Sequence, residues 1–125
     1  MTTADGSVLG STQIFGSAPR NRAFNVVLLA EGFTAAQQND FNNAATAFVN
    51  AFRASPPYDE LSPAINVFRV NVASTDAGAD DPASAGGTGA TARTYFDASF
   101  GGNGIRPVNS VYRSKISGQV GPRKK

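Results

Sequence analysis

The side chains best placed to do chemistry are four carboxylates and one serine, which lie at the end of one apolar segment or in the polar stretch that follows another. They are Glu31, Ser74, Asp76, Asp80 and Asp81. Calcium accepts irregular shells of carboxylate and carbonyl oxygens, so Asp76, Asp80 and Asp81 are candidate calcium ligands. Their spacing is not that of an EF-hand, and loop acids more often cap turns, so the structural role is favoured. Glu31 is the best-placed single carboxylate for ligand binding, but an acid without a partner can equally well cap the helix that follows, so we favour a structural role.

The residue types that are missing restrict the chemistry further. The chain of 125 residues contains no histidine and no cysteine. It therefore lacks the neutral nitrogen ligand that zinc uses and the side chain that most often acts as general base near pH 7. Ser-His-Asp, Cys-His and His-Glu-x-x-His mechanisms are ruled out for this chain acting alone, and we expect no catalytic residue and no zinc ligand in it.

One glycine-containing segment resembles a nucleotide-binding loop. Residues 87–92 fit the loose pattern G-x-G-x-x-A of dinucleotide-binding proteins. That motif joins a strand to a helix, whereas this segment follows a polar stretch, so a plain flexible loop is the favoured interpretation. The chain has neither a Walker-type phosphate loop nor a Gly-x-Ser-x-Gly elbow.

Charge is distributed unevenly along the chain. The formal net charge is +2, but all nine acidic residues precede residue 113, and the last segment carries only basic charges, on Arg113, Lys115, Arg123, Lys124 and Lys125. We expect one α/β domain over residues 1–112 and a flexible, solvated tail over residues 113–125. The domain has no basic patch for nucleic acid. We also expect no membrane association, since no apolar run approaches the roughly 20 residues of a membrane span and no signal peptide is visible.

The pattern of apolar residues predicts the elements that must position the candidate site. Val8–Phe15 reads as a short edge strand, and the nearly continuous apolar run Phe24–Leu29 as a central strand covered on both faces. Thr34 with Gln37 three residues later is a capping-box pattern for a helix. Apolar residues then recur at spacings of three and four up to Phe52, and Pro56-Pro57 ends the helix.

A β-branched segment over residues 65–73 completes the unit. A strand, a helix and a second strand connected in this way form a parallel crossover, and ligands of such units bind beyond the carboxyl ends of the strands. Here that position is Glu31-Gly32 and Ser74–Gly78. The fold class expected is therefore α/β: a small mixed sheet with one long covering helix, in the order strand, strand, helix, strand. The polar stretch 74–91 is long enough to be functional or mobile, and residues 105–111 could form a last strand.

Several segments together resemble a known family. They are Phe24-Asn-Val-Val-Leu-Leu-Ala-Glu-Gly-Phe-Thr34, the helix bearing Phe41, Pro57-Tyr58, Ile65-Asn-Val-Phe-Arg-Val70, Ser74-Thr-Asp-Ala-Gly-Ala79, Thr94-Tyr-Phe96 and Phe100-Gly101. In this order they resemble the amino-terminal part of the IgA-peptidase family of bacterial zinc metallopeptidases, over about residues 10–108. The resemblance implies the substrate-edge half of a zincin catalytic domain, in a family that is often secreted. Its His-Glu-x-x-His helix has no counterpart here, so zinc is expected only in the full-length family and no catalytic residue can be carried over.

Three functions remain open at this point. The first, which we favour, is a non-catalytic binding or assembly module. The second is the substrate-edge portion of a working peptidase that another chain completes, and the third is a small-ligand or calcium-binding domain that uses residues 74–91. Because half of the parent fold is missing, apolar surface should remain exposed, and we expect a homo-oligomer.

Overall fold

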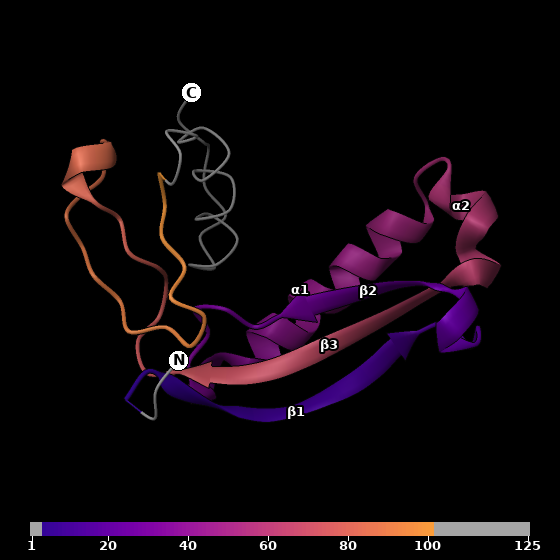
Figure 1. Cartoon of the computed structure of the whole chain (residues 1–125), viewed down its shortest axis with the longest axis horizontal. Coiled ribbons are helices and arrows are strands. Elements are labelled where there is room, and N and C mark those ends of the chain that lie inside the picture. The colour runs from indigo at the N-terminus through magenta and orange to yellow at the C-terminus, as the bar shows by residue number, and fades with distance from the viewer. Residues whose placement is uncertain (1–3, 102–125) are drawn as a thin grey trace.

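The computed structural model describes residues 4–101 and contains the predicted α/β unit. Its elements are β1 (Gly6–Phe15), β2 (Phe24–Leu29), α1 (Gln38–Arg53), α2 (Tyr58–Leu61) and β3 (Ile65–Ser74), with short 3-10 turns between them. The order strand, strand, helix, strand and the mixed sheet confirm the expected fold class (Figure 1). The extended segment expected at 105–111 and the basic tail 113–125 lie outside the described residues.

The central strand of the sheet is β3, and the expectation that Phe24–Leu29 would be central was wrong. The strand order is β1-β3-β2, with β1 antiparallel and β2 parallel to β3. Within residues 4–101, β2 is an edge strand, and Val27 and Leu29 are 52% and 47% exposed. Its apolar run indicated coverage on both faces, but only one face of β2 is turned toward a helix. β1 is an edge strand as expected, although it begins two residues earlier than predicted.

Helix α1 covers one face of the sheet because its apolar residues lie along a single stripe. Phe41, Ala45 and Val49 are buried, and Val49 packs with Ile65 and Val67 of β3. The start of the helix is the one predicted: Thr34 and Gln37 form a capping box, and Gln37 Oε1 accepts a hydrogen bond from the Thr34 N–H at 3.0 Å. The first turn, 35–37, is 3-10 and passes directly into α1.

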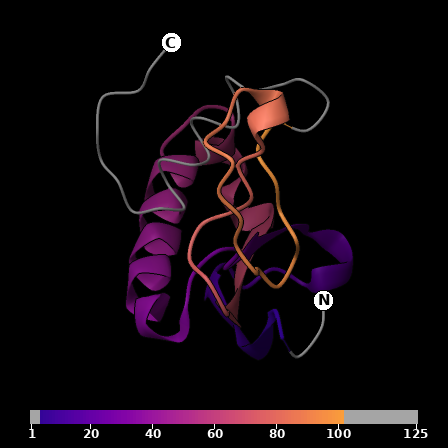
Figure 2. The same cartoon turned by 90° about the vertical axis from the view of Figure 1, so that its left-hand side faces the viewer.

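The opposite face of the sheet is open along much of its length. Paired residues of parallel strands point to the same face, so Val27 lies beside Phe68 and Leu29 beside Val70 on this side. The guanidinium of Arg20 lies over the Phe68 ring at 4.8 Å. Figure 2 shows α1 on one side of the sheet only.

After β3 the chain forms one long excursion, residues 75–101, which we call the polar loop. It leaves the carboxyl end of β3, contains a single 3-10 turn at Ala83–Ala85, and returns over the same end of the sheet (Figure 1). Isolated bridges join its two arms, between Asp80 and Ser99 and between Asp81 and Ala90. Within residues 4–101 no helix has the length and apolar character to cross a bilayer.

Candidate functional site

The expected ligand position, beyond the carboxyl ends of the parallel strands, is filled by the returning arm of the polar loop. Glu31 follows β2 by two residues and Ser74 ends β3, and both side chains are buried, at 4% and 3% exposure. Because β2 and β3 are parallel, their ends meet at the same side of the sheet. The structure therefore brings these two predicted site residues together. What they contact is the loop itself.

The Glu31 carboxylate is the main anchor of the polar loop. It accepts hydrogen bonds from the Thr94 hydroxyl at 2.8 Å, from the Ala98 N–H at 2.8 Å and from the Phe96 N–H at 3.1 Å. A carboxylate offers about four lone-pair positions, so most of its capacity is used. In place of the N-terminus of the following helix, the Glu31 carboxylate holds a segment more than sixty residues further along the chain.

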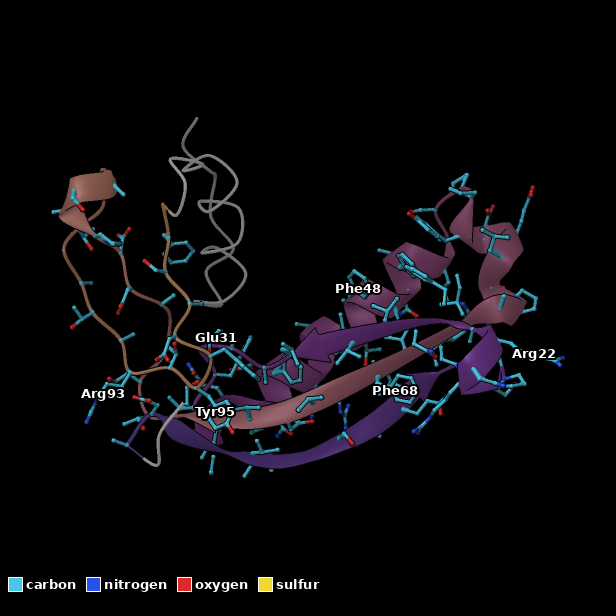
Figure 3. The ribbon with its side chains drawn as sticks, in the orientation of Figure 1. Arg22, Glu31, Phe48, Phe68, Arg93 and Tyr95 are labelled. Atoms are coloured by element: carbon cyan, nitrogen blue, oxygen red, sulfur yellow. The ribbon has the colours of Figure 1, made fainter. Side chains whose placement is uncertain are left out.

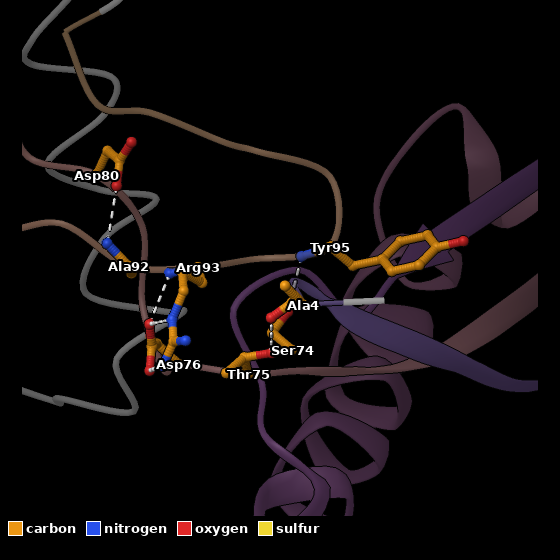
Figure 4. Close-up of polar contacts among 8 residues, drawn as sticks. All are labelled: Ala4, Ser74, Thr75, Asp76, Asp80, Ala92, Arg93 and Tyr95. Carbon is orange, nitrogen blue, oxygen red and sulfur yellow. Dashed lines mark hydrogen bonds and ion pairs between the residues drawn. The ribbon is translucent and has the colours of Figure 1, made fainter. Parts of the chain in front are cut away.

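Ser74 supports the same segment from the neighbouring strand. Its hydroxyl oxygen accepts hydrogen bonds from the Gly32 N–H at 3.3 Å and from the Tyr95 N–H at 3.2 Å. The Ser74 N–H in turn donates to the Phe33 carbonyl at 2.8 Å. Ser74 thus joins the ends of β2 and β3 to the loop, and Figure 4 shows its contact with Tyr95.

Asp76 and Arg93 pair the two arms of the loop where they leave the sheet. The Asp76 carboxylate accepts hydrogen bonds from the Arg93 Nε at 3.0 Å and from the Arg93 backbone N–H at 2.8 Å, and the Asp76 N–H donates to the Arg93 carbonyl at 3.0 Å (Figure 4). The side-chain hydrogen bond from Arg93, followed by the backbone one, lowers the pKa of Asp76 below its ordinary value. The same side-chain contact raises the pKa of Arg93.

Asp80 and Asp81 continue this pairing toward the tip of the loop. Asp80 accepts a hydrogen bond from the Ala92 N–H at 2.8 Å (Figure 4). Asp81, buried at 4% exposure, accepts from the N–H and the hydroxyl of Thr88, both at 3.0 Å. Gly87 packs so closely on Asp81 that a β-carbon there would overlap the carboxylate. The nucleotide-like pattern at 87–92 therefore belongs to an internal turn and joins no strand to a helix.

These contacts give the carboxylates a common physical role. The polar loop has few large apolar side chains to bury, and carboxylates that accept backbone N–H groups replace apolar packing along its arms. Within residues 4–101, no group of three or more acidic, histidine or cysteine side chains is arranged to hold a metal ion. The three aspartates proposed for calcium accept hydrogen bonds from the adjacent residues Arg93 and Ala92 and from Thr88.

No sequence pattern pointed to Thr94, which is fully buried and donates a hydrogen bond to Glu31. Residues 93–97 were expected to anchor the far end of the loop, and Tyr95 and Phe96 do pack against the core cluster of Ala30, Phe33, Phe41 and Val72. The partner of the threonine could not be foreseen, because a lone Thr carries no pattern. The one indication in the sequence was that Thr94 lies within residues 93–97, the segment expected to anchor the loop.

Comparison with known proteins relates this chain to one family. A search of curated proteins gave no match. The family model described as IgA Peptidase M64 matches residues 12–110, which is most of the chain and contains both parallel strands, α1 and the whole polar loop. The match agrees with the resemblance drawn from residues 10–108. The chain therefore belongs to the IgA peptidase M64 family.

Proposed function

We propose that this chain is a non-catalytic part of a metallopeptidase-related fold and acts as a binding or assembly module. The observation that carries the proposal is the use of the strand-end acids. Glu31, Asp76, Asp80 and Asp81 all accept internal hydrogen bonds that hold the polar loop on the sheet. Together with the absence of histidine from the chain, this favours a scaffold over a reaction centre.

Membership of the family supports the metallopeptidase relationship but assigns no chemistry to these residues. Zinc peptidases need imidazole or carboxylate ligands and an open coordination position with a bound water. At the strand ends and in the polar loop, the carboxylates of Glu31, Asp76, Asp80 and Asp81 already accept hydrogen bonds from the protein. A zincin-like arrangement would then require that the zinc ligands come from outside this chain.

The test measures zinc content and proteolysis on the purified chain. We expect substoichiometric zinc by elemental analysis and no cleavage of unfolded protein substrates, with or without a zinc chelator. Glu31→Gln is the matched variant, because it changes the best-placed carboxylate and nearly preserves its shape. Stoichiometric zinc together with chelator-sensitive cleavage, reduced in Glu31→Gln, would overturn the proposal.

A second candidate, the substrate-edge portion of a peptidase that another chain completes, is favoured by one specific feature. Within residues 4–101 the outer edge of β2 is not paired with any strand, and extended peptides bind by adding a strand to such an edge. Mixing the purified chain with a catalytic M64 domain would test this. Chelator-sensitive cleavage that requires both proteins would support it, and cleavage independent of this chain would eliminate it.

The calcium-binding alternative makes a separate prediction. If Asp76, Asp80 and Asp81 rearranged around Ca²⁺, binding to the folded state would raise the melting temperature as the ion is titrated. We expect no shift, because the three carboxylates hold separate parts of the loop. A saturable shift that is lost in Asp80→Asn would establish the alternative.

A further inference from the structure

Within residues 4–101, the outer edge of β2 presents a regular row of backbone groups that pair with no other strand. The Ala30 N–H donates to the Val70 carbonyl at 3.1 Å. Backbone groups of a strand alternate in direction, so Asn25, Val27 and Leu29 turn their N–H and C=O groups away from β3. No residue from Phe24 to Leu29 is charged or a proline, and the register with β3 is unbroken. Such an edge is a template for another strand.

The other edge of the sheet is different. The ladder between β1 and β3 has two irregularities, between Val8 and Gly10 and between Gln13 and Phe15. Gly6 and Gly10 also have φ values of 142° and 149°, which residues with a β-carbon rarely adopt. Bulges and irregular backbone of this kind disfavour pairing at a strand edge. Pairing through an edge is therefore expected at β2 and not at β1.

We infer that a second copy of this chain occupies the β2 edge, with the two β2 strands antiparallel about a two-fold axis at Val27. This register places Val27 opposite Val27 of the partner subunit and Asn25 opposite Leu29 of the partner subunit. All the outward backbone groups of both strands are then hydrogen-bonded, and the two sheets form one continuous sheet. The inference goes beyond the proposed function, since it specifies the contact and not the activity.

The side chains along β2 suit this arrangement. On the open face of the sheet, Val27 and Leu29 are 52% and 47% exposed, and the two-fold axis places Val27 opposite Val27 of the partner subunit and Leu29 diagonally beside it. Phe24, which is 60% exposed at the start of β2, comes opposite Ala30 of the partner subunit. Cross-strand contacts between apolar residues stabilise antiparallel pairs. Pairing through one strand of six residues buries less area than a standard interface of about 800 Å² per partner, so we expect a concentration-dependent dimer.

The distribution of charge favours the antiparallel orientation and a second copy as the occupant. Among residues 4–101, the end of the sheet that carries the polar loop has more acidic than basic side chains, with Glu31, Asp40, Asp76 and Asp80 against Arg93. At the opposite end, Arg20, Arg22 and Arg53 outweigh Asp59 and Glu60. Figure 3 shows Glu31 and Arg93 at one end and Arg22 at the other. An antiparallel dimer places the acidic end of each subunit beside the basic end of its partner, whereas a parallel pair would place like charges together.

Cysteine cross-linking tests the register directly, because the natural chain has no cysteine. In Val27→Cys the two thiols would sit on residues whose Cα atoms are about 5.5 Å apart, within the range that a disulfide spans. Val8→Cys is the matched control: it is the same substitution, Val8 is 53% exposed against 52% for Val27, and it lies on the irregular edge strand. We expect mild oxidation to give a covalent dimer with Val27→Cys and a much lower yield with Val8→Cys.

A second pair of variants tests the same contact without new covalent chemistry. Val27→Lys places two ammonium groups opposite each other on the axis, while Val8→Lys adds the same charge elsewhere. Light scattering of the full chain should show a dimer for the unmodified protein and Val8→Lys, and a monomer for Val27→Lys with an unchanged circular dichroism spectrum. A strictly monomeric unmodified chain at high concentration, or equal cross-linking at both cysteines, would overturn the inference. A monomer without peptidase activity would overturn the inference of a dimer and still leave the proposed non-catalytic function in place.

Discussion

Removal of the Glu31 carboxylate should release the polar loop from the sheet. Glu31→Ala leaves three donors without an acceptor: the Thr94 hydroxyl, which is fully buried, and the Phe96 and Ala98 N–H groups. Each buried donor that loses its partner costs about 1–3 kcal/mol. Some of these donors will form hydrogen bonds with water after the substitution, which reduces the penalty. We therefore expect a loss of about 3–5 kcal/mol in the free energy of unfolding of the loop.

Two more conservative variants separate the contributions to this loss in the free energy of unfolding. Thr94→Val removes one donor at nearly constant volume and should cost about 1–2 kcal/mol. Glu31→Gln keeps one carbonyl oxygen but directs an amide NH₂ toward groups that are themselves donors. Its loss in the free energy of unfolding should therefore fall between those of Thr94→Val and Glu31→Ala. In the double variant Glu31→Gln with Thr94→Val, the losses should be less than additive, because the two side chains share one hydrogen bond.

Hydrogen exchange and urea unfolding of the same samples form the assay. Exchange at the Phe96 and Ala98 amides should accelerate in Glu31→Ala, since both amides are bonded to the carboxylate in the folded chain. The unfolding midpoint should also fall, because Tyr95 and Phe96 pack against the core. Unchanged exchange at these amides together with an unchanged midpoint would refute the assignment of Glu31 as the loop anchor.

Two further predictions concern the ion pair and the helix. Arg93 lowers the pKa of Asp76 in the folded state. The contribution of this ion pair to folding stability is therefore complete above the ordinary Asp pKa and is lost as the pH falls through the lowered value. An NMR titration of the Asp76 carboxyl should show the lowered midpoint in the natural chain and an ordinary midpoint in Arg93→Ala. Phe41→Ala should cost about 3–5 kcal/mol by thermal unfolding, because Phe41 is 4% exposed, whereas Phe48→Ala on the same helix should cost far less, because Phe48 is 38% exposed. Equal losses for the two phenylalanines would contradict the orientation of α1.

The elements that the sequence predicted well are those whose signals are local. The capping box of Thr34 and Gln37, the end of α1 before Pro56-Pro57 and the strand at 65–74 each depend on residues close together in the chain. Strand order is a non-local property, and the strand order predicted from the sequence was wrong. The apolar run of β2 predicted a central position, but β1, far away in the sequence, pairs with β3 and leaves β2 at the edge.

The candidate site shows the same division. Its location at the strand ends followed from the parallel crossover, because the carboxyl ends of parallel strands must meet. The partners of each acid did not follow, since they depend on the path of the polar loop: Glu31 bonds residues 94, 96 and 98, and Asp81 bonds Thr88. Ligand binding by these residues remains a prediction that the calcium and zinc experiments address.

The physical organisation of the chain connects its two proposals. At the strand ends, where parallel α/β units generally bind ligands, the polar side chains already make internal hydrogen bonds. Along β2, the outward backbone groups of Asn25, Val27 and Leu29 have no partner among residues 4–101. Polar groups that are already paired gain little from a ligand, whereas unpaired backbone beside exposed apolar side chains gains from any strand that covers it. The capacity of this chain for binding is therefore expected at its sheet edge and not at its acids.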